Sequence, residues 1–228
     1  MIKVTENLRK IQDLLRAEAD AAGRVPESVK LLAVSKRKPV EAILEAASAG
    51  QRDFGENFAQ EGVDKIDGTG RDDLTWHFIG HLQSNKTRLV AERYDWVHTI
   101  DRIKIARRLS QQRPHHAGDL NVCIQVNIDD EQSKSGIRPE DVEAMASEIA
   151  ALPKLKLRGL MCIPAVQSGM DAQRKPFAAL RRLLESLQQQ GLELDTLSMG
   201  MSADYPAAIR EGATIVRIGT LLFGERDG

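Results

Sequence analysis

Short runs rich in β-branched residues alternate with helical segments along almost the whole chain, and this alternation limits the fold more than any other feature. Strands that alternate with helices predict a parallel sheet. An amphipathic helix with Leu8, Ile11, Leu14 and Leu15 on one side precedes the first strand. The strands that we expect cover residues 31–34, 53–54, 76–79, 96–100, 122–128, 157–162, 196–199 and 214–218.

Eight strand–helix units can close into a barrel or remain an open, doubly wound sheet. No G-x-G-x-x-G pattern follows the first strand, as it does in open dinucleotide-binding sheets, and eight units suit closure. The length of 228 residues is close to that of one such barrel, and no linker or repeat divides the chain. We therefore predict an α/β fold, a single (β/α)8 TIM barrel with an extra N-terminal helix, as one domain over residues 1–228.

The balance of charges excludes several classes of partner. Lysine and arginine number 32 against 33 acidic residues, so a net charge of −1 creates no broad field that would attract nucleic acid or an anionic membrane. The sequence has neither the apolar core of a signal peptide nor an apolar run of membrane-spanning length. Cys123 and Cys162 lie in separate apolar runs, which predicts buried free thiols and a protein of the reducing cytoplasm.

Lys36 stands at the C-terminal end of the first predicted strand, after the run Leu-Leu-Ala-Val-Ser. In a TIM barrel the ligand binds at this end of the strands, so the amine would face the barrel mouth. Arg37 and Lys38 disfavour the charged form of a neighbouring amine, and a neutral lysine can form an imine with an aldehyde. The same residues also fit another interpretation, in which Lys36 is a surface lysine at the end of a strand.

Two segments near the end of the chain lie where barrels of this type bind phosphate. Ser198-Met-Gly-Met-Ser202 follows the seventh strand, and Arg217-Ile-Gly-Thr220 closes the eighth. Glycines let backbone amides approach an anion, and the hydroxyls of Ser202 and Thr220 add donors. A helix that begins near Ala203 would direct its positive end to the same place. Ordinary strand-to-helix turns have similar sequences, so this pattern alone does not distinguish a phosphate site from such turns.

Arg217 is unusual because strand alternation places it on the same face as Ile215 and Gly219, inside an apolar run. A guanidinium in such a place needs a partner. A buried ion pair would provide one, and the ring nitrogen of a bound pyridine would provide another.

Two histidines belong to the run Trp76-His-Phe-Ile-Gly-His-Leu-Gln-Ser-Asn-Lys86, which spans the third predicted strand and the loop after it. His77 and His81 would lie near the top of the barrel. Because the pair straddles a strand and a glycine, rather than lying on one helix, we expect hydrogen-bonded structural roles and no metal site. Asn57, at the end of the second strand, could reach a ligand in the mouth.

These motifs together resemble a known family, the YggS/PROSC group of pyridoxal phosphate homeostasis proteins. The resemblance covers essentially the whole chain, and its segments occur in the family's order. They are Leu-Leu-Ala-Val-Ser-Lys36, Phe54-Gly-Glu-Asn57, His77-Phe-Ile-Gly-His-Leu-Gln-Ser-Asn-Lys86, Lys134-Ser-Gly136, Ser198-Met-Gly-Met-Ser202 and Val216-Arg-Ile-Gly-Thr220. The segment from His77 to Lys86 is particularly specific to the group.

The resemblance implies a fold and a cofactor. The fold would be the N-terminal barrel of alanine racemase, and the cofactor would be pyridoxal 5'-phosphate (PLP), held as a Schiff base on Lys36. Ser202, Gly219 and Thr220 would hold the phosphate. Arg217 would lie near the pyridine nitrogen, where an arginine keeps that nitrogen unprotonated and weakens the ring as an electron sink. The further pocket residues that the family implies are Asn57 and Met201.

The resemblance also implies a role without turnover. Alanine racemases and related decarboxylases add a C-terminal β domain that completes their active site, and we expect this chain, which stops shortly after Gly224, to lack it. The expected protein is a monomer that binds PLP and serves vitamin B6 homeostasis, with apo PLP-dependent enzymes as candidate acceptors.

Two alternatives stay open at this point. One is a small PLP-dependent enzyme such as an amino-acid racemase. The other is a barrel that binds a different phosphorylated metabolite and uses Lys36 as an aldolase-type amine. The lysines that could offer a second PLP site are Lys38, Lys86 and Lys134.

Overall fold

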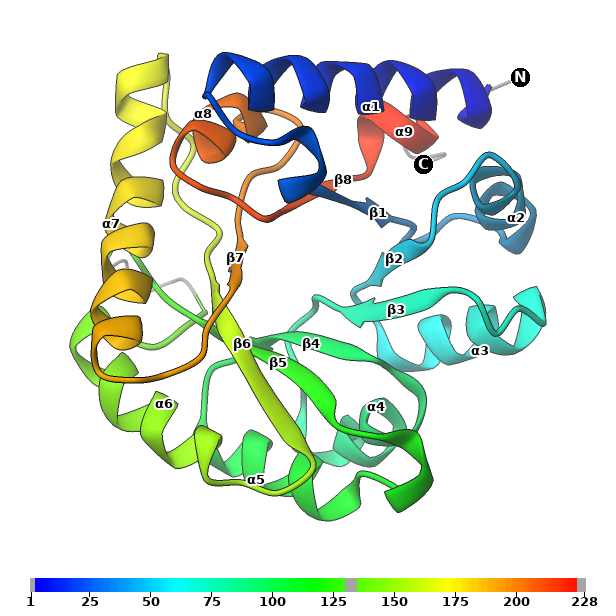
Figure 1. Ribbon diagram of the computed structural model, residues 1–228. Helices are drawn as coiled ribbons and strands as arrows, with labels where there is room; N and C mark the ends of the chain where they lie inside the picture. The colour runs from blue at the N-terminus through cyan, green and yellow to red at the C-terminus, as the bar shows by residue number, and fades with distance from the viewer. Residues whose placement is uncertain (1–2, 130–134, 225–228) are drawn as a thin grey trace.

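The computed structural model describes residues 3–129 and 135–224, and it forms a closed barrel surrounded by helices (Figure 1). Eight parallel strands follow one another around the barrel in sequence order, and β8 pairs with β1 to close it. The strands are β1 (Lys30–Val34), β2 (Asp53–Glu56), β3 (Thr75–Phe78), β4 (Trp96–Ile100), β5 (Leu120–Gln125), β6 (Leu155–Met161), β7 (Thr196–Ser198) and β8 (Ile215–Ile218). The predicted fold class is confirmed, and every expected strand is present.

The helices cover the outside of the barrel, where they bury the outward-facing side chains of the strands. They are α1 (Val4–Ala21), α2 (Val40–Ser48), α3 (Ala59–Thr69), α4 (Thr87–Arg93), α5 (Ile103–Gln112), α6 (Val142–Ala150), α7 (Met170–Gln189), α8 (Tyr205–Arg210) and α9 (Thr220–Phe223). Short 3-10 helices cover Pro26–Ser28, Ser84–Lys86, His115–Ala117 and Pro139–Asp141. None of the helices in the described ranges is long and apolar enough to cross a membrane.

The N-terminal helix α1 lies across α8 and α9, next to the end of the described chain (Figure 1). The amide of Asn7 donates a hydrogen bond to the carbonyl of Leu222 over 3.0 Å, which ties α1 to α9. The prediction for Leu14 is wrong, because this side chain is 48% exposed. The buried stripe instead follows a spacing of three and four residues, which is the period of one helix face. Its members are Val4, Leu8, Ile11, Leu15 and Ala19.

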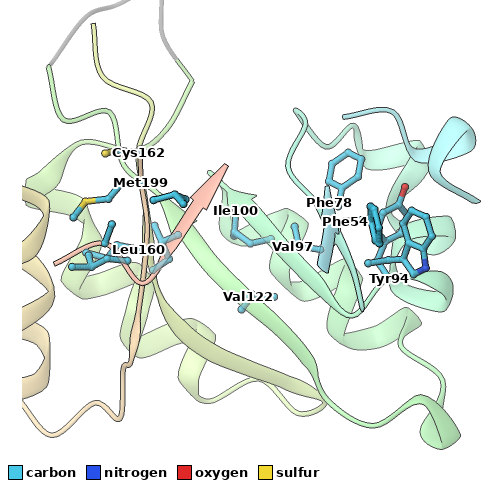
Figure 2. Close-up of a cluster of buried hydrophobic side chains, with 14 of the residues drawn as sticks. Phe54, Phe78, Tyr94, Val97, Ile100, Val122, Leu160, Cys162 and Met199 are labelled. Carbon is cyan, nitrogen blue, oxygen red and sulfur yellow. The ribbon is translucent and has the colours of Figure 1, made fainter. Parts of the chain in front are cut away.

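The apolar core has two parts, one between strands and helices and one inside the barrel. Figure 2 shows side chains of the outer part, where the rings of Phe78 and Tyr94 meet edge to face with centroids 5.6 Å apart. The inner part is smaller and consists of Leu32, Ile79, Trp96, Cys123, Met161 and Ile215. Both cysteines are buried and form no disulfide, as predicted, and burial raises the pKa of the Cys123 thiol to about 12.

Candidate cofactor site

A cavity of about 310 Å³ opens at the C-terminal ends of the strands, which is the ligand-binding end of a TIM barrel. Its volume lies in the range of small-molecule pockets. All seven predicted site residues line it, so the structure brings together positions that are far apart in the sequence. The lining residues are Val34, Lys36, Asn57, Ile79, Ile163, Met201, Ser202, Ala203, Arg217, Gly219 and Thr220.

Lys36 lies in a turn directly after β1, and its side chain is half-buried at the edge of the cavity. Ser35, which precedes it, is fully buried, whereas Arg37, which follows it, is exposed and has a backbone φ of +59°. A residue other than glycine is strained when its backbone φ is positive, so the surrounding structure must hold this turn in place.

A buried ion cluster holds the turn of Lys36 from below. The ammonium of Lys65, on α3, donates to the carbonyl of Ser35 over 2.7 Å, to Glu56 Oε1 over 2.8 Å and to Glu61 Oε1 over 2.6 Å. The hydroxyl of Ser35 also donates to Glu56 Oε1, and the backbone N–H of Arg37 donates to Glu61 Oε1. The cluster therefore holds the backbone on either side of Lys36, through Lys65 at Ser35 and through Glu61 at Arg37.

Glu56 is the most buried member of this cluster. Burial raises the pKa of its carboxyl, and the positive charge of Lys65 and its hydrogen bond oppose that rise. Its second oxygen, Oε2, is buried without a hydrogen-bond partner in the described part of the chain. Lys65 thus provides most of the interaction that offsets the cost of burying this carboxylate.

The loop after β7 requires a glycine at one position. Gly200 has a φ of +92°, and a Cβ there would lie 2.6 Å from the Cβ of Ala208. Helix α8 begins at Tyr205, two residues after Ala203, near which we predicted its start. In the loop before it, Asp204 Oδ1 accepts a hydrogen bond from the backbone N–H of Met201 over 2.6 Å.

Helix α9 begins at Thr220, directly after β8, and the sequence patterns did not predict it. The first N–H groups of a helix have no partner within it, so Thr220 opens a turn whose free donors suit a phosphate. Gly219 is the residue before it, and a Cβ there would approach the carbonyl oxygen of Val34 to 3.1 Å. A short extra helix at the phosphate site is a recurrent feature of TIM barrels, and that regularity was the available signal.

Arg217 is buried on β8 and reaches into the cavity. Its Nη1 donates to Ser198 Oγ and its Nη2 to the carbonyl oxygen of Cys162, each over 2.9 Å. Burial lowers the pKa of this guanidinium. Within residues 3–129 and 135–224 it forms no ion pair with a carboxylate, so the buried ion pair that the sequence left open is absent from this part of the chain.

The residues of the cavity fit PLP. Asn57 Oδ1 is buried and has no hydrogen-bond partner among the described residues, so a polar ligand atom would satisfy this side-chain amide. The cavity also offers an amine at Lys36, a buried cation at Arg217, and hydroxyls at Ser202 and Thr220. The amine suits the aldehyde of PLP, the cation suits its pyridine nitrogen, and the hydroxyls suit its phosphate.

The structure separates the two histidines of the third strand and its loop. His77 is fully buried inside the barrel, not at its top as predicted, and it contacts Asp53 and His98. His81 is exposed, with Nδ1 3.6 Å from a carboxylate oxygen of Asp101. No group of three potential metal ligands occurs in the described ranges. The prediction of a structural, hydrogen-bonded role for His77 is confirmed.

The buried histidines predict how stability depends on pH. Burial lowers the pKa of both His77 and His98 from the usual 6.5, which favours their neutral form in the folded protein. Below pH 6.5 the unfolded chain binds protons that the folded protein does not, and stability falls with pH. We expect chemical denaturation to show a free energy of unfolding that decreases as the pH falls from 7 to 5, with a contribution from each buried histidine.

Two variants separate this effect from general acid sensitivity. His98→Gln should have a shallower loss of stability with falling pH, because one neutral histidine is removed. His81→Gln, which changes an exposed side chain, should keep the slope of the wild type. Equal slopes for all three proteins would show that the buried histidines do not control the pH dependence.

Three further lysines were candidates for a second PLP site. Lys86 lines a neighbouring cavity of about 420 Å³ that shares Asn57 with the main one. Lys38 is half-buried and does not line the main cavity. Lys134 lies outside the described residues. The sequence left a second PLP site open, and the structure does not decide it.

Comparison with known proteins first defines the class of the barrel. A family model for the N-terminal domain of alanine racemase matches residues 4–227. Alanine racemase from Clostridium difficile 630 superposes with a TM-score of 0.76 at 16% identity, and the match covers 98% of this chain and 58% of that one. At this identity the likeness shows the fold alone. The chain is a barrel of the alanine racemase N-terminal class.

Closer relatives identify the family. The pyridoxal phosphate homeostasis protein of Pseudomonas aeruginosa is 56% identical over 227 residues, covering 100% of this chain and 97% of that protein. PipY of Synechococcus elongatus PCC7942, solved with PLP bound, is 39% identical with a TM-score of 0.82, and the match covers 97% of this chain and all of that one. The chain belongs to the pyridoxal phosphate homeostasis protein family, and the resemblance seen in the sequence is confirmed.

Proposed function

We propose that this chain binds PLP as a Schiff base on Lys36 and serves PLP homeostasis without turning over a substrate. The cavity that unites Lys36 with Arg217 and the loops after β7 and β8 carries the proposal. Two comparisons support it, because the relative from Pseudomonas aeruginosa is named a homeostasis protein and not an enzyme, and PipY was solved with PLP.

Each group of the cavity has a role in this proposal. When bound, PLP supplies an aldehyde for a lysine and a ring that can accept electrons. Lys36 would bind PLP through its aldehyde group, while Ser202, Thr220 and the first turn of α9 would hold the phosphate. Arg217 would lie near the pyridine nitrogen and keep it unprotonated, which would make the ring a poorer electron acceptor. Such an arginine disfavours reactions that need the ring as a full electron sink.

Reduction with borohydride tests where PLP binds. The protein is incubated with an equal amount of PLP, reduced, digested and analysed by mass spectrometry. We expect the phosphopyridoxyl group on Lys36 alone, and loss of the visible absorption on reduction. Modification mainly at Lys38 or Lys86 would contradict the assignment. A protein that stays colourless with PLP would favour the aldolase-type alternative.

Transfer to an apoenzyme tests the homeostasis role. The PLP-loaded protein is mixed with an apo PLP-dependent enzyme, and the recovered activity is compared with that from equal free PLP. Faster or fuller activation by the loaded protein supports delivery. No gain over free PLP would restrict the role to buffering.

The enzyme alternative is tested with the same preparation. A racemase removes the α-proton of an amino acid and returns one from solvent. Incubation of common amino acids with excess loaded protein in heavy water would then introduce deuterium at the α-carbon. We expect none, and its appearance would show that the protein is an enzyme.

We also propose that residues 1–228 form one domain that acts as a monomer. The described barrel spans the chain from α1 to α9, and α1 contacts both α8 and α9. Light scattering of the PLP-loaded protein should give the mass of one chain. A mass of two chains would contradict the monomer.

A further inference from the structure

Polar side chains form a continuous line through the inside of the barrel. Asp53 Oδ1 lies 3.0 Å from His77 Nε2, and His77 Nδ1 lies 2.9 Å from His98 Nε2. His98 Nδ1 lies 2.7 Å from Ser198 Oγ, which accepts a hydrogen bond from Arg217 Nη1 over 2.9 Å. These five residues come from β2, β3, β4, β7 and β8. They connect the start of β2 with the cofactor cavity.

The chemistry of the two ends gives this line a single direction. A carboxylate only accepts, so His77 donates from Nε2 to Asp53 and, being neutral, accepts at Nδ1. His98 therefore donates from Nε2 to His77 and accepts at Nδ1 from the hydroxyl of Ser198. A guanidinium only donates, so Ser198 must accept from Arg217. Every group donates toward Asp53, and no donor or acceptor is in conflict.

The surroundings hold the two imidazole rings in place. His77 stacks on Trp96 with ring centroids 5.3 Å apart and planes inclined by 14°. His98 meets His77 edge to face and is fully buried. Charged groups near the line are Lys30, which donates to Asp53 over 2.9 Å, and Asp95, which faces His77 at longer range. The line thus consists of fixed, neutral rings between a carboxylate and a guanidinium.

The far end of the line reaches the opposite side of the barrel. Asp53 and Lys30 border a cavity of about 330 Å³ at the N-terminal ends of the strands. The carboxylate whose charge acts on the buried Arg217 is Asp204, whereas Asp53 is connected to Arg217 only through the line of hydrogen bonds. Hydrogen bonds in such a chain polarise one another, so a change at one end affects the other.

We propose that Asp53, His77, His98 and Ser198 are positioning residues that orient the Arg217 guanidinium in the cofactor cavity through one directional hydrogen-bond chain. The chain uses Nη1 of Arg217, while the carbonyl of Cys162 fixes Nη2, so the plane of the guanidinium is set before PLP binds. This inference rests on the proposed PLP site for its consequence. The chain itself can be tested without PLP.

Nitrogen NMR of the wild-type protein tests the direction of the chain. The five histidines are labelled with ¹⁵N, and the ring shifts are followed between pH 8 and pH 5. We expect two rings, those of His77 and His98, to remain neutral with the proton on Nε2. A proton on Nδ1 of His77 or His98, or an ordinary titration of either, would overturn the proposal whether or not PLP binds.

A double-mutant cycle tests the action on Arg217. We expect Asp53→Asn to raise the dissociation constant for PLP roughly three- to tenfold, and to have less than about a twofold effect when Arg217 is already methionine. Asp73→Asn is the control, because Asp73 pairs with Arg52 and Arg71 and takes no part in the hydrogen-bond chain. It should leave the affinity for PLP unchanged in both backgrounds. An equal effect of Asp53→Asn in both backgrounds would overturn the proposal.

Discussion

Replacing Lys36 by alanine is expected to abolish the borohydride-sensitive absorption. It should also raise the dissociation constant for PLP at least about a hundredfold, because the covalent bond between the protein and PLP is lost. The loops after β7 and β8, which we propose to hold the phosphate, remain, so weak, non-covalent binding should persist. Lys36 lies half-buried in a turn and belongs to neither part of the apolar core, so the fold should survive. Titration followed by absorption measures the affinity, and thermal unfolding measures the fold.

Lys38→Ala is the matched control for this experiment. Lys38 lies two residues further along the same turn, and it does not line the cavity. This variant should keep the absorption of the wild type and nearly its affinity. A Lys36→Ala protein that still forms a borohydride-sensitive adduct, lost only when Lys38 is also changed, would move the cofactor lysine.

The sequence predicted the fold well because the signal for each strand is local. Runs such as residues 96–100 carry enough β-branched and aromatic residues to mark a strand without knowledge of its neighbours. The candidate pocket followed from topology, since parallel strands in a closed barrel bring their C-terminal ends together. This rule placed Lys36, Asn57 and Arg217 in one cavity although each ends a different strand.

The parts that the sequence did not reveal depend on partners far along the chain. Lys65 has the sequence context of a solvated helix lysine, and only the fold places it under Ser35, thirty residues earlier. His98 gave no sequence signal at all, because its partner Ser198 lies 100 residues away. The ends of helices were also uncertain, as at Tyr205, because the hydrogen bond from the backbone N–H of Met201 to Asp204 belongs to a loop geometry that the sequence pattern does not reveal.

The second large effect concerns the ion cluster beneath Lys36. Lys65→Met should lower the free energy of unfolding by about 3–5 kcal/mol, because it leaves Glu56 as a buried carboxylate without its cation. Lys10→Met, which breaks an exposed pair with Glu6, should leave the denaturation midpoint unchanged. Chemical denaturation measures both. A loss for Lys65→Met no larger than that for Lys10→Met would contradict this account.

Two further observations would assign the loss to the charge of Glu56 and not to a cavity. The double variant Glu56→Gln with Lys65→Met should recover part of the stability, because no buried charge remains unpaired. Burial already raises the pKa of Glu56, and without Lys65 that pKa rises further. The defect of Lys65→Met should therefore shrink as the pH falls and the carboxyl becomes protonated, and grow as the pH rises through that pKa. Because Lys65 also holds the carbonyl of Ser35, the same variant should bind PLP more weakly at neutral pH, which would link the stability of the cluster to the position of Lys36.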